Sequence, residues 1–294
     1  MKLIKPSYEI LAASGKSDIL PYNYEYQSDK LIELAGRTCY KSESDITIDS
    51  SITFIDNIRK KKHLSVFEHS WELRYYDCNL PRNNFLNYME IGAGTLVAGN
   101  NRAFDESEII PNHISPDKYM INEIYKQKRW NMLSASVKLI VNRGVTHEQV
   151  RHRPVSYSQE STRYCNYSKD KFGGHITYII PPWTQFQPWE GDLYDIPPAE
   201  VNTDINHQIW FKNLLHTEQE YFELLKNGWK PQQARDILPN ALKAEIVVTC
   251  NLQEWIHIFN LRALGTTGTP HPQMSEIMIP LYEDFKKLFP EVFK

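Results

Sequence analysis

The sequence lacks features that define several classes of protein. Its four cysteines, Cys39, Cys78, Cys165 and Cys250, form no C-x-x-C pair. That spacing excludes a paired-cysteine metal site and, with so few thiols, favours a reducing compartment. No stretch approaches the ~18 consecutive apolar residues of a membrane-spanning helix. The first residues also lack the long apolar segment of a signal peptide. We therefore expect a cytoplasmic protein with no membrane partner.

An excess of charge of one sign is also missing. Lys and Arg total 33 and Asp and Glu total 36, so the formal net charge is -3. This balance argues against broad nucleic-acid binding. Hydrophobic residues make up 41% of the 294 residues, which is too many for a disordered chain. The length allows a large core, in either two domains or one large α+β domain.

The hydrophobic periodicity predicts helices and strands in mixed order. Strands are expected at 1–12, 71–78, 135–142, 175–180 and 245–250. Helices are expected at 29–40, 50–61, 204–227, 251–263 and 272–288, with a short helix capped by Thr146. The proline- and aromatic-rich segment 164–203 is expected to run over the surface. Because the strands and helices do not alternate in βαβ order, we expect an α+β fold with a mixed or antiparallel sheet packed against helices.

Three familiar motifs fail on their spacing. The glycines between Gly92 and Gly99 do not have the spacing of a dinucleotide-binding loop, and the chain has no Gly-Lys-Ser/Thr phosphate loop. The segment from His147 to His152 resembles the zinc-binding H-E-x-x-H helix, but Arg151 occupies the place of the second histidine. An arginine is no metal ligand, so we expect no metal site.

The segment 151–164 (RHRPVSYSQESTRY) carries the strongest chemical signal. It places two arginines around a histidine, then small hydroxyl residues, then a third arginine. Arginine forks match pairs of phosphate oxygens, and hydroxyl groups can donate to the same anion. A solvated basic face, paired with acids such as Glu148 and Glu160, is the structural alternative that composition alone leaves open.

The order of these residues resembles the flavin-dependent thymidylate synthases. That family carries RHR, seven residues and then serine, which appears here as Arg151-His152-Arg153 followed by Ser161. Further blocks follow the family order over roughly residues 30–280. They are Gly36–Tyr40, His63–His69, Gly144–Glu148, Ala234–Asn240, Val247–Asn251, Asn260–Arg262, His271–Gln273 and Glu276–Ile277.

The resemblance implies a role for each matching residue. The implied FAD contacts are His63, Ser65, Glu68, Arg151, His152, Arg153, Gln159, Asn251, Gln253 and His257. The implied deoxyuridylate (dUMP) contacts are Glu148, Arg151, Gln159, Ser161, Thr162, Arg163 and Arg235. Arg262 and Ser161 are the implied catalytic residues, with Arg262 beside the uracil. For Ser161, nucleotide binding is favoured over nucleophilic attack because no activating base is evident.

The resemblance also implies the reaction and the partners. Members of the family make thymidylate (dTMP) from dUMP, with methylenetetrahydrofolate as the carbon donor, FAD as the hydride carrier and NADPH as the reductant. They are homotetramers whose active sites lie at subunit interfaces. On this pattern, residues 1–294 form one domain of that family's fold. The segments at about 105–130 and 164–203 are longer than the minimal pattern and are expected to be surface insertions.

Several alternatives stay open from the sequence. Gln253 and His257 depart from the residues that many members carry, and Thr266–Pro270 lengthens the loop after Arg262. Taken singly, Arg262 could be a surface residue that snorkels, and Arg235 could pair with Asp236 or Glu245. A related enzyme that leaves a hydroxymethyl group on the base would keep the same residues. A nucleic-acid-binding module is a different class, against which the net charge of -3 speaks. Cys165 lacks the Pro-Cys setting of the flavin-free synthases, so we expect it to be dispensable.

Overall fold

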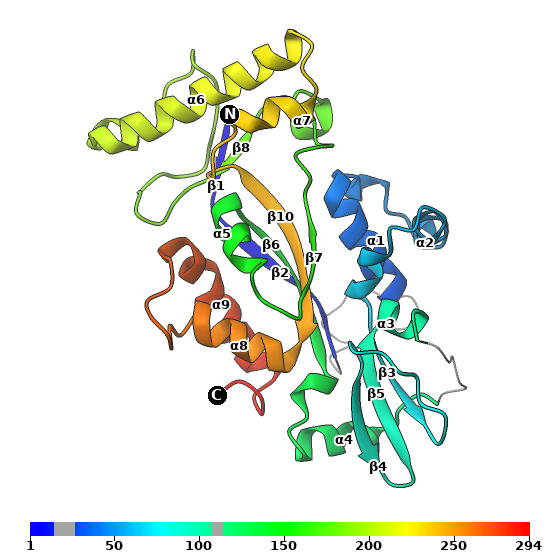
Figure 1. Ribbon diagram of the computed structural model, residues 1–294. Coiled ribbons are helices and arrows are strands. Elements are labelled where there is room, and N and C mark those ends of the chain that lie inside the picture. Colours follow the sequence, from blue (N-terminus) through cyan, green and yellow to red (C-terminus); the bar gives the residue numbers. More distant parts are fainter. Residues whose placement is uncertain (15–26, 108–113) are drawn as a thin grey trace.

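The computed structural model describes residues 1–14, 27–107 and 114–294. It is an α+β arrangement of three sheets and surrounding helices, as expected (Figure 1). The predicted insertion at 105–130 falls in part on residues 108–113, which lie outside the described residues. No helix in the described ranges combines the length and the apolar character needed to cross a membrane.

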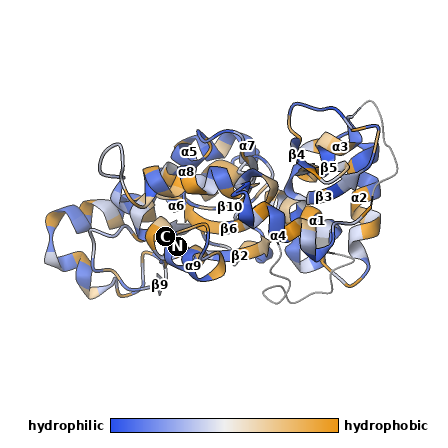
Figure 2. Cartoon of the chain, turned by 90° about the horizontal axis from the view of Figure 1, so that it is seen from below, coloured by the Kyte–Doolittle hydropathy of each residue, from blue (hydrophilic) through white to orange (hydrophobic). Residues whose placement is uncertain are grey.

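A four-stranded antiparallel sheet lies at the centre of the molecule. Its strand order is β2 (Ser7–Ala13), β6 (Ser134–Asn142), β10 (Lys243–Asn251) and β7 (Ser156–Gln159). β6 and β10 pair along their whole length, from Lys243 opposite Asn142 to Asn251 opposite Ser134. Both strands are almost continuously buried, because helices cover both faces of the sheet. The view from below in Figure 2 shows the apolar colour of these two strands between the helices.

The two faces of the central sheet differ in character, because successive side chains of a strand point to opposite faces. Val137 and Leu139 of β6 and Ile246 and Val248 of β10 are fully buried on the face covered by two helices. These helices are α8 (Leu252–Arg262) and α9 (Pro272–Leu288). Their packing is largely aromatic, with the rings of Trp255 and Phe285 5.0 Å apart.

The opposite face carries polar groups beneath helix α1 (Gln27–Tyr40) and the 3-10 helix η4 (Leu64–His69). Leu11, Ala35 and Val247 form a small apolar contact there. Beside it, three lysines and three glutamates form a network of ion pairs. Its members are Lys41, Lys138, Lys243, Glu43, Glu160 and Glu245. Burial alone would raise the pKa of Glu245, but the three ammonium groups hold it well below its usual value.

A second antiparallel sheet lies beside the first and has the order β3 (Trp71–Tyr76), β5 (Gly94–Asn100), β4 (Asn87–Ile91). The third sheet joins β8 (Thr177–Ile179), β1 (Lys2–Ile4) and β9 (Trp189–Glu190) under the long helix α6 (Ile205–Lys226). The remaining helices are α2 (Ser50–Lys60), α3 (Asn101–Asp105), α4 (Lys118–Lys126), α5 (Arg143–Gln149) and α7 (Pro231–Ala234). The remaining 3-10 turns are η3 (Glu43–Asp45), η5 (Trp130–Met132), η6 (Asp170–Phe172), η7 (Ala199–Thr203) and η8 (Arg235–Ile237).

The long helices and most strands agree with the sequence prediction, but several details were wrong. The expected strand over 1–12 is broken at Pro6 into β1 and β2, and β4, β5, β7 and β9 were not anticipated. The short helix α5 is capped by Asn142, whose side chain accepts from the Val145 amide, so Thr146 is not its cap. Gly228 follows α6 with a φ of +94°, as a helix-ending glycine should.

Segment 164–203 is exposed for much of its length, as a surface segment should be, but parts of it are packed inside. Cys165, Ile176, Tyr178 and Phe186 are almost fully buried and form a second core with α6. Trp183, Tyr194 and Ile196, by contrast, are exposed.

Candidate functional site

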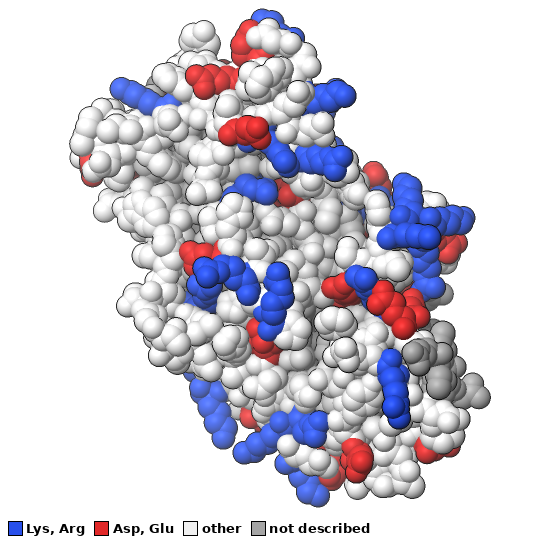
Figure 3. All heavy atoms as spheres, viewed as in Figure 1, with Lys and Arg blue, Asp and Glu red and all other residues white. Residues whose placement is uncertain are grey.

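The RHR segment lies in the loop that joins α5 to β7. In this loop Arg151 and Arg153 are exposed, whereas His152 between them is buried, with 5% of its surface accessible. Figure 3 shows basic side chains gathered in the middle of this face, at the level of α5 and α8 in Figure 1. The loop therefore presents two cations to solvent and one imidazole to the interior.

Arg262, at the end of α8, is held against this loop by three hydrogen bonds. Its Nε donates to Nε2 of His152 at 3.1 Å. One terminal nitrogen donates to Glu148 Oε2 at 2.8 Å and the other to the Glu148 carbonyl oxygen at 3.3 Å. Arg262 therefore does not snorkel freely over an apolar helix, and its guanidinium has one fixed orientation.

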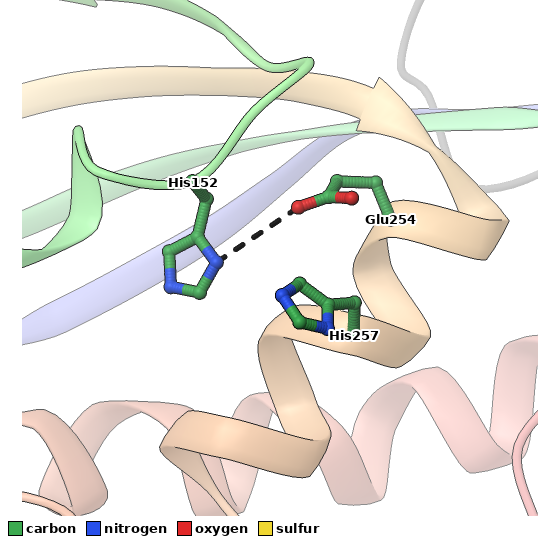
Figure 4. Close-up of side chains that lie close together, drawn as sticks. All are labelled: His152, Glu254 and His257. Atoms are coloured by element: carbon green, nitrogen blue, oxygen red, sulfur yellow. Dashed lines mark ion pairs between the residues drawn. The ribbon is translucent and has the colours of Figure 1, made fainter.

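His152 is a neutral acceptor in this arrangement. Burial and then the charges of Arg262, His257 and Arg151 lower its pKa to about 4. On the other side of the imidazole, Nδ1 lies 3.8 Å from Glu254 Oε1 (Figure 4). The His257 ring meets the His152 ring edge-on, with the centroids 5.7 Å apart. Burial raises the pKa of Glu254 to about 7.

These groups line an open cavity of about 680 Å³, which we call the Arg262 cavity. Its walls include Glu148, Arg151, His152, Arg153, His257 and Arg262, and the lengthened loop 267–271 forms one rim. A neighbouring cavity of about 510 Å³, the Glu68 cavity, is lined by Glu68, Arg102, Arg153, Ser156 and Asn251 among others. Arg153 lines both cavities, so the two adjoin.

Glu68 is positioned by η4 and by two partners. One of its carboxylate oxygens accepts from Arg102 at 2.8 Å and the other from the Ser156 hydroxyl at 3.1 Å. The next residue, His69, is fully buried, and its ring nitrogens lie 2.9 Å from the hydroxyls of Ser158 and Thr249. His69 thus joins η4 to β7 and β10 and holds Glu68 at the cavity.

The other residues expected near a flavin are distributed differently. The Asn251 side chain lines the Glu68 cavity and also caps α8, accepting from the Glu254 amide at 2.8 Å. His63 lies in a third cavity of about 580 Å³ between α1 and α2, together with Arg37 and Tyr40. Ser65 and Gln253 are exposed and line none of these three cavities.

The residues expected to bind dUMP fall into two groups. Glu148 and Arg151 lie at the Arg262 cavity, whereas Ser161, Thr162 and Arg163 follow the far end of β7. There the Ser161 amide donates to the Cys39 carbonyl at 3.0 Å, and Arg163 Nε donates to Gln232 at 3.4 Å.

Arg235 is exposed on η8, directly after the helix that holds Gln232. Gln159, at the end of β7, donates to the Thr146 hydroxyl at 3.2 Å. Within one copy of the chain, the Arg262 cavity is therefore lined by Glu148 and Arg151 but not by the other residues expected to bind dUMP.

The sequence left open that Glu148 and Glu160 neutralise the arginines of segment 151–164. In the structure both acids pair with residues outside this segment. Glu148 pairs with Arg262, and Glu160 is buried against Lys243 at 2.8 Å. Over the described residues, no ion pair involves Arg151, Arg153, Arg163 or Arg235. These guanidinium groups therefore remain available to an anionic ligand.

Burial and the nearby Glu160 raise the pKa of the Cys165 thiol to about 12, which disfavours a nucleophilic role.

Sequence reasoning missed Arg102 and Glu254. The spacing of Glu254 and His257 on one predicted helix was visible, but their approach to His152 depends on the folded chain.

Comparison with known proteins matches these elements to one family. Residues 96–291 match the family model described as thymidylate synthase complementing protein. A relative from Pyrococcus abyssi named flavin-dependent thymidylate synthase is 36% identical over 121 residues, covering 41% of this chain and 42% of that protein. A relative of the same name from Corynebacterium efficiens is 29% identical over 158 residues, covering 52% and 57%.

The chain thus spans about half the length of the curated relatives it matches. Among solved structures, a UMP/dUMP methylase PolB from Streptomyces cacaoi bound with 5-Br UMP matches with a TM-score of 0.47. Its sequence identity is 17%, over 100% of this chain and 94% of that one. That overlap is too loose to bear on the fold.

Proposed function

The chain belongs to the thymidylate synthase complementing protein family, and we propose that it is an enzyme that converts dUMP into dTMP by a flavin-dependent reductive methylation. The observation that carries this proposal is the Arg262 cavity, where a fixed guanidinium stands beside the exposed Arg151 and Arg153. We also propose that residues 1–294 form one domain with this family's fold.

We propose that the arginines bind the nucleotide phosphate. A phosphate monoester carries close to two negative charges at neutral pH, so it needs more than one cation. Arg163 and Arg235 are exposed, and no acidic partner among the described residues neutralises either of them. Ser161, Thr162 and Gln159 would add hydrogen bonds, and Glu148 and Arg151 would contact the nucleotide from the Arg262 side. Ser161 accepts from the Arg163 amide at 3.3 Å, which suits a binding role.

Arg262 is the residue to which we assign electrostatic catalysis. Carbon–carbon bond formation at C5 of the uracil requires electron density on the ring. A guanidinium beside the ring stabilises the negative charge that develops there. Because Glu148 and His152 already fix the orientation of Arg262, this stabilisation needs little rearrangement during the reaction.

The donor set of the Glu68 cavity fits FAD. Arg153 is a cation suited to its diphosphate, because no ion pair among the described residues neutralises it, and Asn84, Asn87, Asn100 and Asn251 offer amide groups for its polar edges. Glu68, Arg151, His152 and His257 complete the proposed contacts. When bound, the flavin supplies the hydride, while the protein orients it and excludes water.

The proposed site is completed by other copies of the chain, in a homotetramer. His63, Ser65 and Gln253 lie outside the Glu68 cavity, and Arg163 and Arg235 lie apart from Arg262. An interface between copies would bring these separate groups together. We further propose NADPH as the reductant, methylenetetrahydrofolate as the carbon donor and the cytoplasm as the location, with neither nucleic acid nor membrane as a partner.

The mass of the product tests this function directly. The protein is incubated with dUMP, FAD, NADPH and methylenetetrahydrofolate, and the nucleotide is analysed by mass spectrometry. A product heavier by a methyl group supports the proposal, whereas one that also carries an extra oxygen identifies a hydroxymethylase. The Arg262→Ala variant should give no product. The Lys286→Ala variant on the outer side of α9 should match the wild type.

A further inference from the structure

Glu254 has an unusual position in the first turn of α8. Its Oε1 is buried and has no hydrogen-bond partner among the described residues. A buried carboxylate oxygen without a partner is costly, so its retention calls for an explanation. Nδ1 of His152 lies 3.8 Å from this oxygen, and a small rotation of either side chain would bring the two into hydrogen-bond range (Figure 4).

The proton on His152 can be assigned from its partners. Arg262 Nε is always a donor, so Nε2 of His152 must offer it a lone pair. His152 is neutral at ordinary pH because its pKa lies near 4, and a neutral imidazole carries one proton. That proton is therefore on Nδ1, which is the nitrogen that faces Glu254.

This assignment argues against a metal ion at the same place. His152, Glu254 and His257 offer ligand atoms that all lie within 4.8 Å of one another, as two histidines and a carboxylate can around a divalent cation. A metal would need the lone pair of His152 Nδ1, but the hydrogen bond from Arg262 leaves the proton there. The guanidinium beside the imidazole would also repel a dication.

We propose that Glu254 is a positioning residue for Arg262, acting through His152. Its carboxylate stabilises the Nδ1–H form of His152, which leaves Nε2 free to accept from Arg262. Glu148 holds the other side of the same guanidinium. This inference rests on the proposed function, in which Arg262 meets the pyrimidine.

The ionisation of Glu254 makes this arrangement sensitive to pH. With a pKa of about 7, its carboxyl group is largely protonated in mildly acidic solution. The protonated acid can donate from its O–H as well as accept, so it no longer favours the Nδ1–H form and also allows the form of His152 that carries the proton on Nε2. In that form the Nε2–H of His152 faces the Nε–H of Arg262, and the hydrogen bond is lost because both groups are donors. The charged or titratable groups facing Glu254 are His152, His257, Cys250 and Tyr157.

The test compares Glu254→Gln and Glu254→Leu with the wild type over pH 5.5 to 9. We expect kcat of the wild type to fall as the pH drops through about 7. Glu254→Gln cannot titrate, and its amide offers both a donor and an acceptor at every pH, as the protonated acid does, so this acid limb should vanish. Glu254→Leu keeps the volume but loses the acceptor, so kcat should drop about 10- to 100-fold at every pH, with little change in the KM for dUMP.

Controls separate this role from a merely structural one. Flavin binding and thermal unfolding should be similar in all three proteins. Glu283→Gln, an exposed glutamate on α9, should keep the wild-type pH profile. A folded Glu254→Leu protein with wild-type kcat and an unchanged acid limb would overturn the inference. So would tight binding of Zn²⁺ that is lost in both Glu254→Gln and His257→Ala.

A second readout does not depend on the reaction. Nitrogen-15 NMR of histidine-labelled protein distinguishes Nδ1–H from Nε2–H, and the signal that is lost in His152→Asn identifies His152. We expect the Nδ1–H form in the wild type above pH 8 and its loss in Glu254→Leu. If dUMP yields no product, the proposed function fails while this measurement still decides the inference. An Nε2–H form in the wild type would contradict it.

Discussion

The buried imidazole of His69 links three segments of the chain through only two hydrogen bonds. Its ring nitrogens reach Ser158 on β7 and Thr249 on β10, and Thr249 donates onward to Ser136 on β6 at 2.7 Å. Because burial lowers the pKa of His69 to about 3, the ring stays neutral where an exposed histidine would be charged. Because Thr249 gives its own hydrogen to Ser136, it accepts from Nδ1–H of the neutral ring, and Nε2 then accepts from the Ser158 hydroxyl. These two bonds keep η4 and Glu68 in place.

His69 should make the stability of the protein depend on pH. The unfolded chain binds a proton at His69 near pH 6.5, and the folded chain does so only near 3. Its contribution is therefore complete above pH 6.5 and is lost as the pH falls towards 3, by about 1.4 kcal/mol per pH unit. His69→Gln should remove this slope. Urea unfolding of both proteins between pH 7.5 and 5 measures it.

The comparison with the variant isolates this one group. Glu254 acts in the opposite direction, because its pKa is raised to about 7 in the folded chain and its stabilisation is lost as the pH rises. It is present in both proteins, so its effect cancels in the difference. Equal slopes for the wild type and His69→Gln would mean that His69 is not the buried neutral group described above.

At the scale of elements, the position of α8 decides the geometry of the site, because this helix carries Glu254, His257 and Arg262 together. Its inner side packs on β6 and α9 through Trp255, whose indole donates to the Ala135 carbonyl at 3.0 Å. Phe285 of α9 contacts both Trp255 and Phe259, with ring centroids 5.0 Å apart in each pair. The aromatic layer therefore fixes the helix on which Arg262 stands.

Phe285→Ala should destabilise the protein by about 3–5 kcal/mol, because it opens a cavity in this layer. Phe285→Leu fills more of the space and should cost less. Chemical denaturation gives the free energy of unfolding for both variants. A loss below about 1 kcal/mol for Phe285→Ala would show that the layer collapses around the gap and does not hold α8.

The sequence predicted these elements unevenly, for physical reasons. The periodicity of 251–263 and 272–288 identified α8 and α9 because their buried faces follow the helical repeat. Ile205 and Ile209 also follow helical spacing, yet they are 64% and 61% exposed at the start of α6, so the repeat alone does not show which apolar residues are buried. The burial of Cys165 and Phe186 could not be predicted, because they lie in irregular chain without a period.

The candidate site was predictable only where its residues are neighbours in the sequence or belong to a known motif. Arg151, His152, Arg153 and Glu148 were identified together and lie together at the Arg262 cavity. The contact between His152 and Glu254 could not be predicted, because it depends on how α8 packs beneath the loop after α5. Local patterns contain no information on such a distant pairing.

At the scale of the whole molecule, the separation of the arginines matters most. Arg262 stands at the end of α8, near the middle of the molecule in Figure 1, whereas Arg235 is on η8, which directly follows α7 near the top of that view. If these two guanidinium groups serve one substrate, they come from different copies of the chain. The proposed homotetramer would then be required for catalysis as well as for stability.

Mixing two inactive variants tests this arrangement. Arg262→Ala and Arg235→Ala should each be inactive alone. When they are co-expressed in equal amounts, about a quarter of the interfacial sites receive both wild-type arginines, so activity should return to about a quarter. The double variant serves as the control and should stay inactive. No recovery in mixed oligomers of confirmed composition would mean that both arginines act within one copy.

Arg153 forms part of the wall between two adjoining cavities. Two molecules that both touch one guanidinium compete for, or share, the same positive charge. Their binding constants are then thermodynamically coupled, and each must alter the affinity of the other by the same factor. A negatively charged occupant of the Glu68 cavity would therefore weaken the attraction of the Arg262 cavity for its own anion. Through Arg153, the affinity of each cavity depends on whether the other is filled.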